Sequence, residues 1–120
     1  MIIDDEVRIC RLFVQFFEDF DEFAVRFATS AEVALSQLRH EPADVAIVDM
    51  RLPGMRGDMF IRTAHSQGLC SRFVLHTGST EMPLTRELRQ IGLTERNVFF
   101  KPADMELILE RIRELLGGHA

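Results

Sequence analysis

Short apolar segments alternate with longer amphipathic segments along the whole chain. The short segments have the length and composition of strands and cover residues 1–3, 23–28, 45–48, 72–76 and 97–100. The longer segments repeat apolar residues every three or four positions, as helices do, and cover residues 6–20, 29–41, 58–67, 83–91 and 105–116. The pattern therefore predicts five strands, each followed by a helix.

This alternation predicts a parallel sheet with helices on both faces, because parallel neighbours need a helix-length crossover between them. Such crossovers are right-handed, which leaves few possible topologies. We therefore expect an α/β fold of the flavodoxin-like, doubly wound (βα)5 class, with strand order 2-1-3-4-5. Residues 1–120 contain no repeat or low-complexity tract and have the length of one domain.

Local patterns set the expected helix boundaries and faces. Thr29 and Glu32 have the spacing of a capping box and are expected to open the second helix. Pro83 suits the first turn of the fourth helix, and Asp104 is expected to cap the fifth. The first helix carries a stripe expected to face the core: Ile9, Phe13, Phe16, Phe17 and Phe20. The last helix is expected to turn the following residues inward: Leu107, Ile108, Ile112, Leu115 and Leu116.

Charge and composition argue against several classes of protein. A formal net charge of −5 without a basic stripe argues against direct binding of nucleic acid. No apolar run approaches the length that spans a membrane, and the N-terminus lacks the pattern of a signal peptide, so we expect a cytoplasmic protein without membrane contact. Cys10 and Cys70 lie in apolar segments without ligands at metal-binding spacing, and we expect buried free thiols.

Unusual polar residues follow or end the predicted strands. Asp4 and Asp5 follow the first strand, Asp49 the third, Thr77 the fourth and Lys101 the fifth. In a parallel sheet these positions share one edge, where open α/β sheets bind their ligands. Of fourteen basic residues, thirteen are Arg and one is Lys. The position of the single Lys favours a need for a compact ammonium at residue 101, rather than the planar fork of Arg, over chance as the explanation.

The converging groups predict phosphoryl-transfer chemistry. Three carboxylates this close together would repel one another unless a cation lies among them, and hard oxygen ligands suit Mg²⁺. A carboxylate can also attack phosphorus and form an acyl phosphate. That reaction depends on neutralising charge on the phosphoryl oxygens. Mg²⁺, the Lys101 ammonium and the Thr77 hydroxyl would supply the three neutralising contacts.

These residues, with the run Val-Asp-Met-x-Leu-Pro-Gly-Met-x-Gly around Asp49, resemble the receiver (response-regulator, CheY-like) domain of two-component signalling over essentially the whole chain. The resemblance implies that Asp49 accepts a phosphoryl group from a histidine kinase or a histidine phosphotransfer protein. Lys101 would pair with one phosphoryl oxygen, and Thr77 would move to bond another. The family usually has a cis peptide bond before the proline of the Lys-Pro pair, here Pro102.

The resemblance also implies a metal site and a signalling role. Asp5 would be the main Mg²⁺ ligand, supported by Asp4, and the Asp49 carboxylate and the backbone carbonyl of Arg51 would complete the protein ligands. Such a protein is not a turnover enzyme, because it catalyses only its own phosphorylation and dephosphorylation. It would pass a conformational signal to a downstream output protein or domain that the sequence does not name.

The chain departs from the family pattern in three places. Val98 stands where an aromatic residue usually swings with the threonine. Residues 93–96 lack the acidic lead-in to the fifth strand that many DNA-binding response regulators have, and Ala103 replaces a larger apolar residue. These departures concern the readout and the usual dimer surface, whereas the residues expected for the chemistry are all present.

Three other functions compete with this interpretation. A phosphatase with an aspartyl nucleophile would need a general acid two residues after Asp49, and Arg51 stands there. A flavin-binding flavodoxin would need a phosphate loop after the first strand, where Asp4 and Asp5 would repel a phosphate. A degenerate receiver used only for docking would have lost some of the five site residues, and this chain keeps them all.

Overall fold

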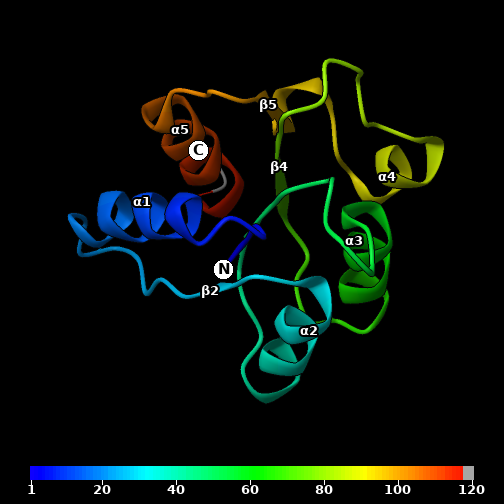
Figure 1. Cartoon of the computed structure of the whole chain (residues 1–120), viewed down its shortest axis with the longest axis horizontal. Helices are drawn as coiled ribbons and strands as arrows, with labels where there is room; N and C mark the ends of the chain where they lie inside the picture. The colour runs from blue at the N-terminus through cyan, green and yellow to red at the C-terminus, as the bar shows by residue number, and fades with distance from the viewer. Residues whose placement is uncertain (118–120) are drawn as a thin grey trace.

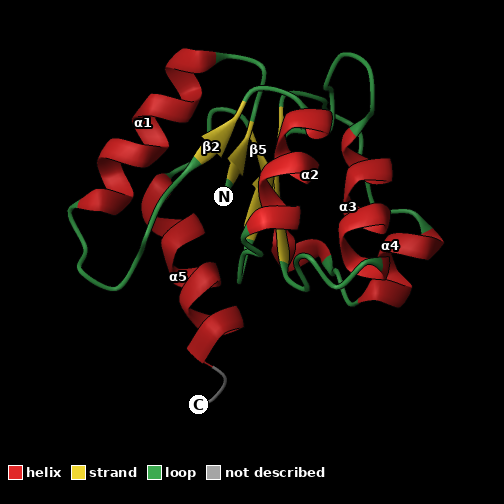
Figure 2. Cartoon of the chain, turned by 90° about the horizontal axis from the view of Figure 1, so that it is seen from below, coloured by secondary structure: helices red, strands yellow, loops and turns green. Residues whose placement is uncertain are grey.

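The computed structural model describes residues 1–117 and shows a parallel sheet between two layers of helices (Figures 1 and 2). The strands are β1 (Ile2–Ile3), β2 (Phe27–Ala28), β3 (Ala46–Val48), β4 (Phe73–Thr77) and β5 (Val98–Phe100). Their order across the sheet is β2-β1-β3-β4-β5, and every neighbouring pair is parallel. The predicted fold class and strand order are confirmed.

Helices cover both faces of this sheet. They are α1 (Val7–Glu18), α2 (Ala31–His40), α3 (Gly57–Ser66), α4 (Arg86–Ile91) and α5 (Met105–Gly117), with a short 3-10 helix, η1 (Glu95–Asn97), before β5. In Figure 2, α1 and α5 lie on one side of the strands and α2, α3 and α4 on the other. No helix in the described residues is both long and apolar enough to cross a membrane.

The two apolar faces of the sheet follow from the alternation of side chains along each strand. Ile3, Val48 and Leu75 belong to the core under α2, α3 and α4. Their neighbours one residue earlier belong to the core under α1 and α5: Ile2, Ile47 and Val74. The central strands are apolar at consecutive positions because both of their faces are covered. Cys10 and Cys70 are buried free thiols, as predicted.

Two boundary predictions were wrong by three or more residues. The strand predicted over residues 23–28 pairs only at Phe27 and Ala28, because its partner β1 is two residues long. Helix α4 begins at Arg86, after Pro83, because the Thr85 hydroxyl accepts the backbone N–H of Leu88 and caps the helix there.

The predicted capping box of α2 is also absent. Ser30, rather than Thr29, is the N-cap, and its hydroxyl accepts the backbone N–H of Val33 at 3.1 Å. The Glu32 carboxylate points to a different partner, Met55, which lies on the loop before α3.

The inward face of α5 is narrower than predicted. Ile108, Leu109 and Ile112 are buried, whereas Leu107 and Leu116 are 53% and 38% exposed. Successive residues of a helix are about 100° apart, so Leu107 cannot share the direction of Ile108. The predicted N-cap is correct, because Asp104 Oδ1 accepts the backbone N–H of Glu106 at 2.9 Å.

Candidate functional site

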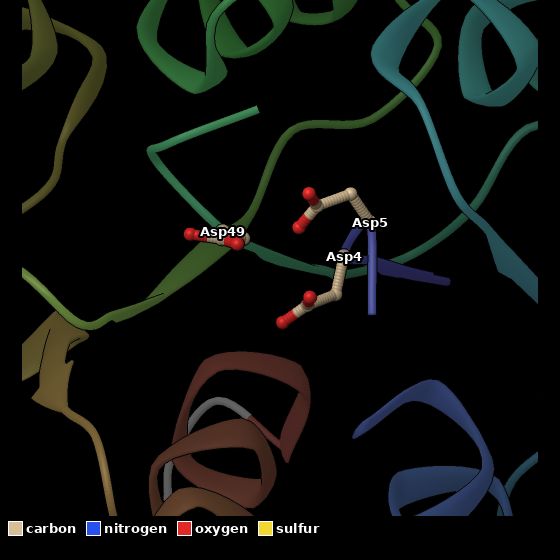
Figure 3. A group of neighbouring side chains, drawn as sticks. All are labelled: Asp4, Asp5 and Asp49. Carbon is tan, nitrogen blue, oxygen red and sulfur yellow. The ribbon is translucent and has the colours of Figure 1, made fainter. Parts of the chain in front are cut away.

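The carboxyl edge of the sheet brings together three aspartates. Asp4 and Asp5 follow β1, and Asp49 follows β3, so the parallel pairing of β1 with β3 places them side by side (Figure 3). Carboxylate oxygens of all three lie within 4.8 Å of one another. Asp4 and Asp49 are buried and Asp5 is exposed, so the cluster opens to solvent at Asp5.

Lys101 supplies a positive charge to this cluster. Its Nζ lies 3.0 Å from Asp4 Oδ2 and 3.5 Å from Asp49 Oδ2. The backbone of Lys101 is fixed to β4, because its N–H donates to the carbonyl of Thr77 at 2.7 Å. The Lys101–Pro102 peptide bond is cis, as the resemblance implied.

Burial and pairing act in opposite directions on the charges of the site. Burial raises the pKa of Asp4, and the N–H of Glu6 and the Lys101 ammonium oppose that rise only in part. Burial also works against the ammonium of Lys101, but the carboxylates of Asp4 and Asp49 outweigh it and raise the pKa of Lys101. Lys101 therefore stays charged, and one ammonium faces three acidic side chains.

The loop between β3 and α3, residues 49–56, carries Asp49 at its start. Arg51 N–H donates to Asp49 Oδ1 at 3.1 Å, which turns the carboxylate toward the loop backbone. The Arg51 side chain is exposed, and it forms no hydrogen bond or ion pair with another of residues 1–117. The far end of the loop returns close to its start, because Gly57 N–H approaches the carbonyl of Met50 at 3.4 Å.

Gly57 belongs to the architecture of the site, although the sequence analysis did not single it out. A Cβ at this position would lie 2.7 Å from the Asp49 carbonyl oxygen and 2.8 Å from Met50 Cα. Only a residue without a side chain allows α3 to begin this close to the phosphoacceptor candidate. The Met-x-Gly at the end of the quoted run is the sequence signal that could have identified it.

Thr77 is fully buried at the end of β4, next to the backbone of Lys101. Its Oγ1 accepts the backbone N–H of Ser79 at 3.1 Å, so its own proton remains available for another acceptor. Gly78 follows, and a Cβ there would come within 3.9 Å only of the Lys101 side chain. The structure thus places the hydroxyl at the same edge as the aspartates and Lys101.

His76 is a second residue that the sequence analysis did not single out. It is 6% exposed, and its ring meets the ring of Phe13 edge to face at 5.1 Å. Its Nδ1 is buried and has no hydrogen-bond partner in the described residues. Burial, followed by the positive charge of Lys101, lowers the pKa of His76 to about 4, and the negative charge of Asp49 opposes this. A neutral histidine therefore lies beside the charged cluster.

Comparison with known sequences identifies relatives of this arrangement. The response regulator receiver domain model matches residues 1–113. The transcriptional activator protein ExaE of Pseudomonas putida is 31% identical over 122 residues, which cover 100% of this chain and 56% of that protein. The chain therefore spans about half the length of this curated relative.

Solved structures share the architecture. A CheY-like response regulator receiver domain protein from Methanospirillum hungatei JF-1 is 26% identical, with a TM-score of 0.77 over 97% of this chain and 90% of that chain. A two-component response regulator from Clostridium difficile reaches a TM-score of 0.82 at 17% identity, over 98% and 93% of the two chains. The chemotaxis protein CheY4 of Vibrio cholerae reaches 0.81 at 22% identity, over 95% and 94%. At these low identities the last two support the fold alone.

Proposed function

This chain belongs to the response regulator receiver domain family, and we propose that it accepts a phosphoryl group on Asp49, with Mg²⁺, from a histidine kinase or a histidine phosphotransfer protein. Phosphorylation would switch its conformation and so signal to a downstream output. The chain would act only on itself and would not turn over a separate substrate.

The observation that carries this proposal is the position of Asp49 relative to Lys101. The Asp49 carboxylate is buried, yet Oδ1 is bonded to the N–H of Arg51 and Oδ2 lies 3.5 Å from the Lys101 ammonium. A phosphoryl group on Asp49 would lie next to a fixed cation that can neutralise its charge. Asp49 does not cap α3, because the N-cap of that helix is Arg56.

The donor set fits Mg²⁺. Asp4, Asp5 and Asp49 offer three hard carboxylate oxygens within 4.8 Å, and Lys101 alone does not balance three negative charges. We propose that these three side chains hold the ion, with Asp5 as the main ligand and the Arg51 carbonyl as the fourth protein ligand. When bound, the ion would neutralise charge on the phosphoryl oxygens.

The residues of the chain would then divide the reaction among them. An Asp49 oxygen would form the bond to phosphorus as the bond from phosphorus to the donor atom breaks, and the donor atom would keep the electron pair of that bond. Lys101 would pair with one phosphoryl oxygen, because its ammonium already reaches Asp49. The free proton of the Thr77 hydroxyl would bond another oxygen, which would draw the loop after β4 toward the site.

The test is phosphorylation with a small acyl-phosphate donor such as acetyl phosphate in the presence of MgCl₂. The wild type should gain one phosphoryl group by intact-mass measurement, and Asp49→Asn should gain none, because an amide is not a competent nucleophile here. Asp44→Asn is the matched control, because Asp44 is an exposed aspartate at the opposite end of β3. Undiminished phosphorylation of Asp49→Asn would contradict the acceptor assignment. A wild type that neither this donor nor a phosphorylated histidine protein can modify would favour a docking module.

A further inference from the structure

Glu32 contacts the β3–α3 loop rather than its own helix terminus. It is the second residue of α2, and its Oε2 accepts the backbone N–H of Met55 at 3.1 Å. The two residues are 23 positions apart in the sequence. Because Ser30 caps α2, the carboxylate of Glu32 is not needed as a cap and can accept a hydrogen bond from the loop.

The conformation of Gly54 allows the Glu32 carboxylate to approach the loop closely. Gly54 has φ +73°, a conformation that favours glycine, and a Cβ there would lie 2.8 Å from Glu32 Oε2. The carboxylate therefore lies directly against the Pro53–Gly54 turn. Glycine at this position serves both the backbone conformation and the close approach of Glu32.

The loop held in this way is the one that presents the phosphoacceptor. It begins at Asp49, and Arg51 N–H bonds the Asp49 carboxylate. Its far end is fixed where Gly57 packs on the Asp49 and Met50 backbone. Two residues before Gly57, the hydrogen bond from Met55 N–H to Glu32 links the last part of the loop to a neighbouring helix, α2.

We propose that Glu32 is a positioning residue for phosphorylation: it holds the β3–α3 loop so that the Asp49 carboxylate and the Arg51 carbonyl face the aspartate cluster. The role rests on the proposed function of Asp49. Glu32 forms no hydrogen bond with Asp4, Asp5 or Asp49, so it acts through the backbone of residues 51–55. A charged acceptor suits this task, because hydrogen bonds to a carboxylate are stronger than neutral ones.

The decisive readout is the Met55 amide, which reports the contact directly and does not depend on phosphorylation. In Glu32→Ala its hydrogen exchange should accelerate by about threefold to tenfold, the range expected for one exposed hydrogen bond. Glu32→Gln keeps an accepting oxygen without the charge, so its exchange rate should lie between those of the wild type and Glu32→Ala. In Glu32→Ala the MgCl₂ concentration that gives half-maximal amide shifts at Asp49 should rise by at least about twofold. The rate of phosphorylation by acetyl phosphate at low MgCl₂ should fall by at least about twofold.

Glu106 provides the matched control. It is also the second residue of its helix, α5, and it is exposed, but its carboxylate bonds no other residue of the described chain. Glu106→Ala therefore removes a helix-terminal charge without touching the loop, and it should leave the Met55 exchange and the MgCl₂ midpoint unchanged. If Glu32→Ala behaved like Glu106→Ala in both measurements, the proposal would be wrong.

A second substitution tests the contact from the other side. Gly54→Ala should destabilise the loop through its positive φ and through the collision with Glu32 Oε2. In the Glu32→Ala background only the first effect remains, so the loss of Met55 protection caused by Gly54→Ala should be smaller there. Additive effects would contradict the contact. A wild type that takes no phosphoryl group while Glu32→Ala still exposes Met55 would refute the proposed function and support the loop contact.

Discussion

The ammonium of Lys101 lies 3.0 Å from Asp4 Oδ2, closer than its 3.5 Å to Asp49 Oδ2. The lysine therefore bridges the two buried carboxylates, and its nearer partner is Asp4 rather than the phosphoacceptor candidate Asp49. Release from Asp4 would leave the ammonium free to follow a new anion on Asp49. A compact point charge on a flexible stem can move in this way, whereas a planar guanidinium would need room for its fork.

Lys101→Arg should therefore keep the positive charge but lose function. We expect MgCl₂ binding within about threefold of the wild type, because the net charge of the site is unchanged, and a phosphorylation-dependent response reduced by about tenfold or more. The response can be measured as amide shifts on addition of beryllofluoride, a phosphoryl mimic. Lys101→Met, which removes the charge, is the reference for complete loss. A fully responsive Lys101→Arg would mean that the single lysine of the chain is an accident of composition.

The fold could be predicted because its signals are local and repeated. Continuous apolar strands such as β3 indicate burial on both faces, and the helices between them leave little choice but a parallel doubly wound sheet. The errors lie where tertiary contacts set the boundary. The two-residue β1 limits β2 to two residues, and Thr85 rather than Pro83 starts α4.

The part of the site that could be predicted consists of polar residues with suitable chemistry at the ends of strands. Asp4, Asp49 and Lys101 are recognisable because strand order places them at one edge. Glu32 could not be recognised, because its bond to Met55 joins segments far apart in the sequence and a local capping motif explained it equally well. The burial of His76 could not be predicted, because nothing in the neighbouring sequence distinguishes a buried histidine in a strand from an exposed one.

Gly57 should be essential for the geometry of the acceptor. In Gly57→Ala the new Cβ would collide with the Asp49 carbonyl and the Met50 backbone, so we expect a loss of about 1–3 kcal/mol in the free energy of unfolding and slower phosphorylation. Urea unfolding and acetyl phosphate kinetics measure the two effects. Gly117→Ala is the control and should be tolerated, because a Cβ at Gly117 would meet no heavy atom of the described residues within 4 Å, apart from its chain neighbours and the backbone of its own helix. Equal stability of the two variants would show that the backbone yields at Gly57.

Arg51 should affect the lifetime of the phosphoryl group. Its guanidinium is exposed and lies two residues beyond Asp49 in the chain, while Gly78 leaves the Thr77 side of the site open. Shielding by Arg51 would slow hydrolysis and the open Gly78 side would favour it, so we predict a change rather than its direction. Arg51→Ala should alter the dephosphorylation rate by more than about threefold, which is ~0.7 kcal/mol in the barrier. Arg56→Ala is the control on the same loop, since Arg56 pairs with Asp58 instead. An unchanged rate would mean that Arg51 points away from the phosphoryl group.

His76 should make the protein less stable as the pH falls. Its pKa is about 4 in the folded protein, against 6.5 for an ordinary solvated histidine, so the unfolded chain binds more protons between these values. The loss of stability should begin below about pH 6.5 and reach about 2 kcal/mol near pH 5. His76→Leu removes this group, so the free energy of unfolding of the wild type relative to this variant, measured in urea, should fall by about 2 kcal/mol between pH 7 and pH 5. Asp4 and the other titrating groups are common to both proteins, so they cancel in the difference. Parallel pH profiles would show that the imidazole is not held neutral.

The conformational response should be confined to one part of the molecule, because α5 is tied to the sheet by side-chain bonds. Asn97 is buried, and its Nδ2 donates to the carbonyl of Phe73 at the start of β4, at 2.8 Å. Arg111 of α5 donates to Asn97 Oδ1 at 3.0 Å and to Glu114 at 3.1 Å. Glu114 also accepts from Arg96 of η1 at 2.6 Å. These bonds join α5, η1 and β4 independently of the loop after Thr77.

At position 98 the chain has a valine in place of the aromatic ring that could couple movement of Thr77 to α5. Val98 is small, 9% exposed and part of the core under α4, so it cannot fill the space that Thr77 would leave. Phe100, the aromatic residue that pairs with Thr77 across the sheet, is 40% exposed instead. We therefore predict that beryllofluoride causes large amide shifts in residues 77–84 and small ones at Arg111. Val98→Phe should enlarge the shifts at Arg111, whereas Val33→Phe, at an exposed site on α2, should not. Equal shifts across both regions in the wild type would show that neither a ring at position 98 nor release of the Asn97 bonds is needed for coupling.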